Sequence, residues 1–144
     1  MAEVGLLEDN TRIAKLCATM LQYAGHRVTI YEHPHECLSA LLPPSITQDV
    51  SKSPPSHSST LPSLPVDVLI LDLHLPDIDG VEVMSRLSSH PHTQSLPLIF
   101  CTAATPTEIA RALRAVPHAI FVEKPFKMQS LTSAVAKALG KLIR

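Results

Sequence analysis

Five short apolar runs, separated by segments of helical period, most constrain how this chain can fold. The runs are Val4–Leu7, Val28–Tyr31, Val66–Leu71, Leu98–Cys101 and Ala119–Val122. They show little of the polar alternation expected of a strand with one exposed face. The pattern therefore predicts strands that are buried on both faces, as in a parallel sheet.

The segments between and after these runs carry apolar residues at the spacing of amphipathic helices. These residues are Ile13, Leu16, Cys17, Met20 and Leu21; Cys37, Leu38 and Leu41; Val81, Val83, Met84 and Leu87; Ile109, Ala112 and Leu113; and Leu131, Val135, Ala138, Leu139 and Leu142. Strand and helix thus alternate five times. Because parallel neighbours need right-handed crossovers, we predict an α/β fold with a doubly wound five-stranded parallel sheet, strand order 2-1-3-4-5, and helices on both faces.

A stretch rich in serine and proline interrupts the pattern between the second helix and the third strand. Pro43–Pro65 offers few residues that could pack in a core. We predict a flexible insertion at 44–65 within a single domain that spans residues 1–144, since surface loops lengthen at small cost. A solvated loop is the main interpretation, and a docking or phosphorylation segment is the alternative.

Charge and cysteine content exclude several classes of protein. The chain has 12 Lys and Arg against 13 Asp and Glu, so no strong basic field draws it to nucleic acid or to a membrane surface. Cys17, Cys37 and Cys101 form no C-x-x-C pair, which favours a reducing compartment. The sequence also shows no signal-peptide pattern and no apolar stretch of the roughly 20 residues that cross a bilayer. We expect a cytoplasmic protein whose partner is another protein or a small molecule.

Three carboxylates follow the first and third predicted strands. Glu8 and Asp9 come after the first strand, and Asp72 comes after the third. The carboxyl ends of neighbouring parallel strands meet at one edge of the sheet, so these side chains should converge there. Crowded carboxylates repel one another unless a cation lies between them, and Mg²⁺ takes one or two carboxylates together with waters and phosphate oxygens. The sequence predicts an Mg²⁺ site in which Asp72 is a nucleophile for a phosphoryl group.

Two donors suited to a phosphate follow the last two predicted strands. The fourth run ends at Thr102, and Lys124 follows the fifth. A hydroxyl and an ammonium group can both bind a phosphate oxygen. Taken singly, a threonine here is usually a helix cap and a lysine is usually a solvated charge. The joint occurrence of five suitable residues at successive strand ends favours a phosphoryl-transfer site.

The motifs at these positions resemble those of response-regulator receiver domains, the CheY-like signalling modules with a flavodoxin-like fold. Glu8-Asp9 resembles the acidic pair, and DLHLPDIDG at 72–80 resembles the phosphoacceptor loop. Thr102-Ala103 resembles the switch threonine with its small neighbour, and Lys124-Pro125-Phe126 resembles the Lys-Pro signature. The resemblance covers the chain apart from the insertion.

The resemblance implies a role for each residue of the metal site. Asp72 would be phosphorylated, and Asp9 and Asp72 would bind Mg²⁺ directly together with the backbone carbonyl of His74. Glu8 would act through water. Side chains at His74 and Ala104 stand at family positions that influence how easily water attacks the phosphoryl group.

The resemblance also implies how the signal would leave the site. Lys124 and Thr102 would contact the phosphoryl group, and Phe121 stands at the position of the switch aromatic. Movement of Thr102 and Phe121 would alter the face made of the fourth helix, the fifth strand and the fifth helix.

The resemblance further implies the partners of the chain. The donor would be a sensor histidine kinase or a histidine phosphotransfer protein, and the recipient would be a downstream effector protein or domain, with a homodimer as a further assembly. The domain would bind neither nucleic acid nor a membrane directly. It would not be an enzyme beyond slow self-catalysed phosphorylation and dephosphorylation.

Other functions remain as alternatives. A phosphate-independent binding module of the same fold would be expected to have lost the acidic pair or Lys124, and both are present. A phosphatase of the haloacid dehalogenase class normally has aspartate where His74 stands. A dinucleotide-binding enzyme would carry G-x-G-x-x-G after the first strand, where this chain has Glu8-Asp9-Asn10-Thr11. The eight histidines are scattered without the spacing of a metal site.

Overall fold

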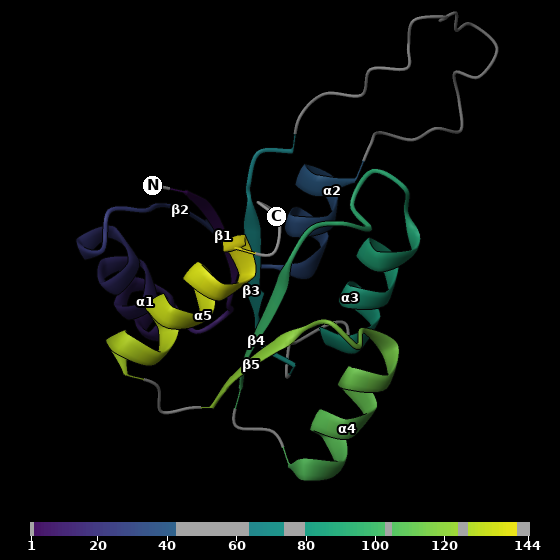
Figure 1. Ribbon diagram of the computed structural model, residues 1–144. Helices are drawn as coiled ribbons and strands as arrows, with labels where there is room; N and C mark the ends of the chain where they lie inside the picture. Colours follow the sequence, from purple (N-terminus) through teal and green to yellow (C-terminus); the bar gives the residue numbers. More distant parts are fainter. Residues whose placement is uncertain (1, 43–63, 74–79, 103–104, 124–126, 141–144) are drawn as a thin grey trace, which may run out of the picture.

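The computed structural model describes residues 2–42, 64–73, 80–102, 105–123 and 127–140 (Figure 1). The strands are β1 (Glu3–Leu7), β2 (Arg27–Tyr31), β3 (Val68–Leu71), β4 (Leu98–Thr102) and β5 (Ile120–Glu123). The helices are α1 (Thr11–Tyr23), α2 (Pro34–Leu41), α3 (Gly80–Ser89), α4 (Pro106–Ala115) and α5 (Met128–Gly140). Each apolar run predicted as a strand and each segment of helical period corresponds to one of these elements, and Leu142 of the last segment lies outside the described residues.

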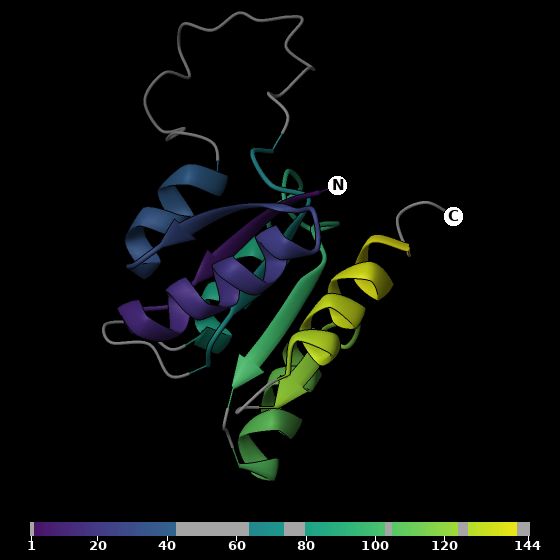
Figure 2. The same cartoon turned by 90° about the vertical axis from the view of Figure 1, so that its left-hand side faces the viewer.

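The five strands form one parallel sheet in the order β2-β1-β3-β4-β5. This arrangement confirms the predicted doubly wound topology. Figures 1 and 2 show α1 and α5 side by side on one face of the sheet and α2, α3 and α4 on the other. Such a sheet places ligand sites beyond the carboxyl ends of its strands, at the point where the strand order reverses.

The core has two parts, one on each face, because successive side chains of a strand point to opposite sides. In β1, Leu7 packs under α2 and α3, whereas Leu6 packs under α1 and α5. In β4, Phe100 and Ile99 divide between the two faces in the same way. All four side chains are at most 2% exposed. Burying each of them contributes roughly 1.5–3 kcal/mol, which holds the central strands in a fixed register.

The prediction that the strands are buried on both faces is correct for the central strands β1, β3 and β4. It is wrong for the edge strands β2 and β5, and in β5 Ile120 and Phe121 are only half-buried. In β2, Arg27 and Thr29 are exposed, and Val28 and Ile30 are half-buried. The reason is that, among the described strands, β2 and β5 lie at the two edges of the sheet, each with one neighbouring strand.

The cysteines are structural within this core. Cys17, Cys37 and Cys101 are all buried and none is in a disulfide. Burial, and to a lesser degree the charge of Glu36, raises the pKa of Cys37 to about 12. This thiol therefore stays protonated and packs as a small apolar group.

Most of the serine- and proline-rich insertion predicted at 44–65 lies outside the described residues. Leu64, near its end, is described, is partly buried and packs against the core beneath α2 and α3. The helices in the described part of the chain are all too short or too polar to cross a bilayer.

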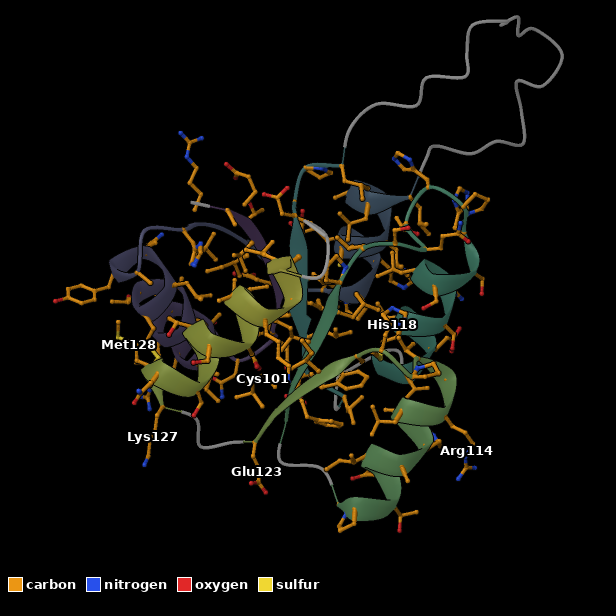
Figure 3. The ribbon with its side chains drawn as sticks, viewed as in Figure 1. Cys101, Arg114, His118, Glu123, Lys127 and Met128 are labelled. Carbon is orange, nitrogen blue, oxygen red and sulfur yellow. The ribbon has the colours of Figure 1, made fainter. Side chains whose placement is uncertain are left out.

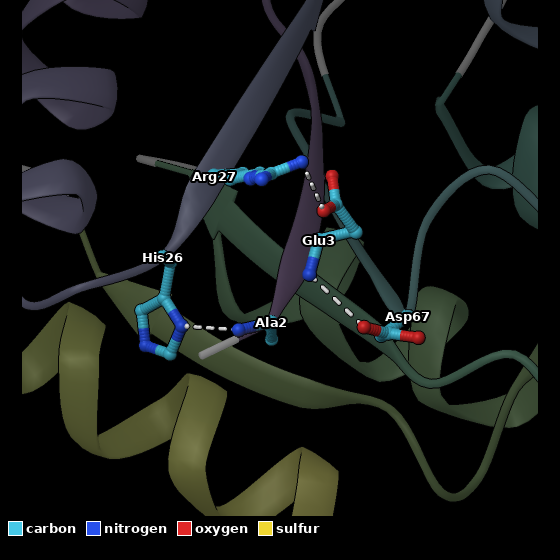
Figure 4. A network of polar contacts seen from close by, with 5 residues as sticks. All are labelled: Ala2, Glu3, His26, Arg27 and Asp67. Atoms are coloured by element: carbon cyan, nitrogen blue, oxygen red, sulfur yellow. Dashed lines mark hydrogen bonds and ion pairs between the residues drawn. The ribbon is translucent and has the colours of Figure 1, made fainter.

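The sheet is tied together at its amino-terminal edge by side chains that accept backbone hydrogen bonds (Figure 4). The backbone N–H of Ala2 donates to Nδ1 of His26 at 3.2 Å, and the backbone N–H of Glu3 donates to Oδ2 of Asp67 at 2.9 Å. The Arg27 guanidinium lies 3.5 Å from the Glu3 carboxylate. These contacts join the starts of β1, β2 and β3 at the edge opposite the predicted site.

This network predicts that His26 makes stability depend on pH. Its Nδ1 accepts a hydrogen bond only when unprotonated, and burial lowers the pKa of His26 below the ordinary value of 6.5. Because the pKa of His26 is lower in the folded protein, the unfolded chain binds more protons at this residue below pH 6.5. The free energy of unfolding therefore falls as the pH drops through that value. Urea unfolding between pH 5 and pH 8 should show this decline, and it should be weaker in His26→Gln.

The exposed His118 supplies the matched control. His118→Gln should keep the full decline in stability below pH 6.5. If His118→Gln removes as much of the pH dependence as His26→Gln does, the hydrogen bond at Ala2 is not its source.

Candidate functional site

The sheet brings two of the predicted carboxylates together. Leu7 of β1 pairs with Leu71 of β3, and Glu8 and Asp72 are the next residues on these adjacent strands. Glu8 and Asp72 are both buried, with 4% and 8% of their surface exposed, whereas Asp9 is exposed. The structure therefore places Glu8 and Asp72, both buried, side by side at the carboxyl ends of two adjacent strands. Asp9, the next residue after Glu8, is exposed to solvent.

Backbone contacts fix how the acidic pair leaves β1. The N–H of Glu8 donates to the carbonyl oxygen of Tyr31, and Oε2 of Glu8 accepts from the N–H of Asn10 at 3.1 Å. Because one oxygen of Glu8 is engaged with the backbone, the exposed Asp9 is the freer of the two to bind an ion directly. The direct role of Asp9 and the water-mediated role of Glu8 stay predictions.

Asn10 is a contributor that the sequence reasoning missed. Its side-chain oxygen accepts from the N–H groups of Arg12 and Ile13 at 3.0 and 3.2 Å, so it caps α1. This cap begins α1 at Thr11, two residues after Asp9. An asparagine just before an apolar periodic segment was the available signal.

The backbone of Thr102 reaches the same edge from β4. Phe100 pairs with Leu71 of β3, and Thr102, two residues further along β4, pairs with Glu123 of β5. The side chain of Thr102 lies outside the described residues, as do His74, Ala104 and Lys124. Since Lys124 directly follows Glu123, its place in the chain is next to the end of β5.

Phe121, the predicted switch aromatic, is described and half-buried. Its ring centroid lies 5.0 Å from that of Phe100, with the ring planes tilted by 47°. Phe121 therefore contacts the same residue of β4 that lies beside the end of β3. This contact connects the site edge with the face made of α4, β5 and α5.

A groove of about 700 Å³ runs along that face. Ile109, Phe121 and Ala134 supply apolar walls, and Lys127 and Lys137 supply positive charge. Figure 3 shows Glu123 and Lys127 at the same end of the sheet, pointing away from it. Sequence reasoning named this face but not its lysines, because their proximity to β5 depends on how α5 packs.

The donor set fits a hard cation that takes few protein ligands. In the part of the chain that the structure describes, no group of three or more His, Cys, Asp or Glu side chains is arranged to hold a metal ion. Mg²⁺ does not require such a group, because it typically binds one or two carboxylates and keeps several waters. Asp9 and Asp72 are the oxygen donors that fit this demand, and the predicted carbonyl ligand at His74 lies outside the described residues.

Comparisons with known proteins identify the family and the fold of the chain. The family model of the response regulator receiver domain matches residues 4–136. RcaC of Microchaete diplosiphon is 29% identical over 97% of this chain and 18% of its own length, and response regulator SaeR of Staphylococcus aureus is 20% identical over 99% and 52%. The chain thus spans about half or less of the length of these curated relatives.

Solved structures show the same fold. The chemotaxis response regulator CheY4 of Vibrio cholerae superposes with a TM-score of 0.72 at 22% identity, covering 96% of this chain and 99% of its own. A response regulator receiver domain protein from Clostridium thermocellum gives 0.73 at 20% identity, with both chains covered fully at 100%. With the family model matched over most of its length, this chain belongs to the response regulator receiver domain family.

Proposed function

We propose that this chain is a phosphorylation switch of a two-component system that accepts a phosphoryl group on Asp72. The observation that carries the proposal is the pairing of Leu7 with Leu71, which sets Asp72 beside the acidic pair at the strand edge. The donor is a phosphohistidine on a sensor histidine kinase or a histidine phosphotransfer protein. The N–P bond of the donor breaks as the bond from phosphorus to the Asp72 carboxylate oxygen forms.

Each residue of this chain has a defined task in that transfer. Asp9 and Asp72 would hold Mg²⁺ together with the carbonyl of His74, and Glu8 would act through water. When bound, Mg²⁺ offsets negative charge on the transferring group. Lys124 contacts the phosphoryl oxygens and balances their charge. The slow reactions of this chain are limited to its own phosphorylation and dephosphorylation.

The response follows from the path between the site and the groove. Phosphorylation adds about −1.5 to −2 charges, and Thr102 moves toward the new oxygens. Phe121 then shifts against Phe100, which it contacts at 5.0 Å between ring centroids, and the α4-β5-α5 face changes shape. Phosphorylation thus shifts the equilibrium between two conformations that the domain already populates.

We place this activity in the cytoplasm and on the single domain of residues 1–144. A downstream effector protein or domain reads the altered face, with a homodimer as a further assembly. Neither nucleic acid nor a membrane is a direct partner of this domain.

Two-dimensional NMR tests the switch. On adding Mg²⁺ and acetyl phosphate, resonances at the ends of β1 and β3 should shift, and those of Phe121 and Ile109 should shift with them. Asp72→Asn should show neither change with the phosphodonor, and Lys124→Ala should keep the phosphoryl group but respond more weakly at Phe121. A wild type whose α4-β5-α5 resonances stay unchanged after it is phosphorylated would favour the phosphate-independent binding module.

A further inference from the structure

We infer that Gly80 is a positioning residue, which keeps Asp72 in place because it has no side chain. The inference rests on the proposed function, in which Asp72 is the phosphoacceptor. Gly80 is the first residue of α3, is buried, and donates its backbone N–H to the carbonyl oxygen of Leu73 at 3.1 Å. The start of α3 is thus joined directly to the residue after Asp72.

The two backbones are closer here than any side chain would allow. A Cβ atom on Gly80 would lie 2.6 Å from Cα of Leu73 and 3.0 Å from its carbonyl oxygen, and it would overlap the carbonyl oxygen of Asp72. All three are backbone atoms, so a change of rotamer cannot relieve the contact. With any other residue at this position, either the Asp72-Leu73 backbone or α3 must move.

Space, rather than backbone conformation, explains the glycine. Gly25, in the turn after α1, has a φ of 98°, and a Cβ atom at that position would have no neighbour within 4 Å. Gly80 is the reverse case, since its φ is not positive and its surroundings are crowded. A side chain at position 25 would therefore strain the backbone, whereas a side chain at position 80 would collide with neighbouring atoms.

Part of the displacement must fall on the Asp72-Leu73 backbone, because α3 is itself anchored. Val83, Met84 and Leu87 of this helix are all 0% exposed, so α3 can retreat only by opening the core. Asp72 must hold its carboxylate in line with the donor, and a misplacement of about 1 Å can slow such a reaction by roughly 100-fold. A side chain on Gly80 thus slows transfer even where the protein remains folded.

The test compares Gly80→Ala with Gly25→Ala, which strains the backbone away from the site. Phosphorylation by acetyl phosphate is followed at saturating Mg²⁺, in trimethylamine N-oxide, which favours the folded state of both variants. Gly80→Ala should react about tenfold more slowly than wild type or worse. Gly25→Ala should lose stability but react within about twofold of wild type, because its Cβ meets nothing.

The amide resonances of Asp72 and Leu73 give a second readout that needs no reaction. They should shift in Gly80→Ala and stay in place in Gly25→Ala. A folded Gly80→Ala that reacts as fast as wild type overturns the positioning role and leaves the proposed function intact. A Gly80→Ala that stays unfolded in the osmolyte also overturns it, in favour of a purely structural role. A wild type that never accepts the group overturns the proposed function itself.

Discussion

Replacing Asp9 by asparagine is expected to weaken Mg²⁺ binding by at least about tenfold, a loss of the size seen when metal sites lose a supporting group. Asparagine keeps the shape of the side chain and one neutral oxygen, so the change isolates the negative charge. That charge matters because Asp9 is the exposed member of the acidic pair, whereas Glu8 accepts a hydrogen bond from Asn10. Titration calorimetry of both proteins measures the difference.

Asp67→Asn is the matched control for this titration. Asp67 lies at the opposite edge of the sheet, where its carboxylate accepts the N–H of Glu3, and asparagine can accept the same hydrogen bond. Asp67→Asn should bind Mg²⁺ as the wild type does. Equal binding by wild type and Asp9→Asn would remove Asp9 from the site, and equal losses in both variants would assign the effect to net charge alone.

The fold was predictable because its pattern is local. Leu6 and Leu7 are adjacent apolar residues that enter opposite halves of the core, which is the mark of a strand covered on both sides. The prediction failed at β2 because the apolar run was begun at Val28. Including Arg27 reveals an alternation of exposed and half-buried residues, which is typical of a strand with one open face.

The part of the site that depends on strand order was predictable, because the carboxyl ends of neighbouring parallel strands meet at the same side of a sheet. That rule put Glu8 and Asp72 at one edge, and the strand register confirms that they follow paired residues. The space at Gly80 was not predictable, because it depends on how closely α3 approaches the end of β3. Sequence alone marked Gly80 as part of a loop motif and not as a close contact of the Asp72 backbone.

The groove on the α4-β5-α5 face was also beyond the sequence. Lys127 and Lys137 are ten residues apart along the chain and line one groove with Phe121 only because α5 packs beside β5. The helical pattern of the sequence shows which side of α5 is apolar, but it does not show which strand lies next to the lysines on its polar side.

Asp72→Asn is expected to abolish phosphoryl transfer completely. An amide has no anionic oxygen to attack phosphorus, whereas the carboxylate of Asp72 follows β3 directly, 8% exposed and beside the acidic pair. Asparagine preserves the size of this nearly buried side chain, so the variant should stay folded. Loss of transfer in a folded variant would then report on the chemistry of residue 72.

Intact-protein mass spectrometry after incubation with acetyl phosphate and Mg²⁺ measures this most directly. The wild type should gain the mass of one phosphoryl group, peptide mapping should locate it at Asp72, and removal of Mg²⁺ by a chelator should prevent the gain. Asp67→Asn should gain it as well, because its carboxylate lies at the other edge of the sheet. A folded, Mg²⁺-supplied wild type that gains no mass from acetyl phosphate or from a histidine kinase, or an Asp72→Asn variant that gains it equally, would contradict the account.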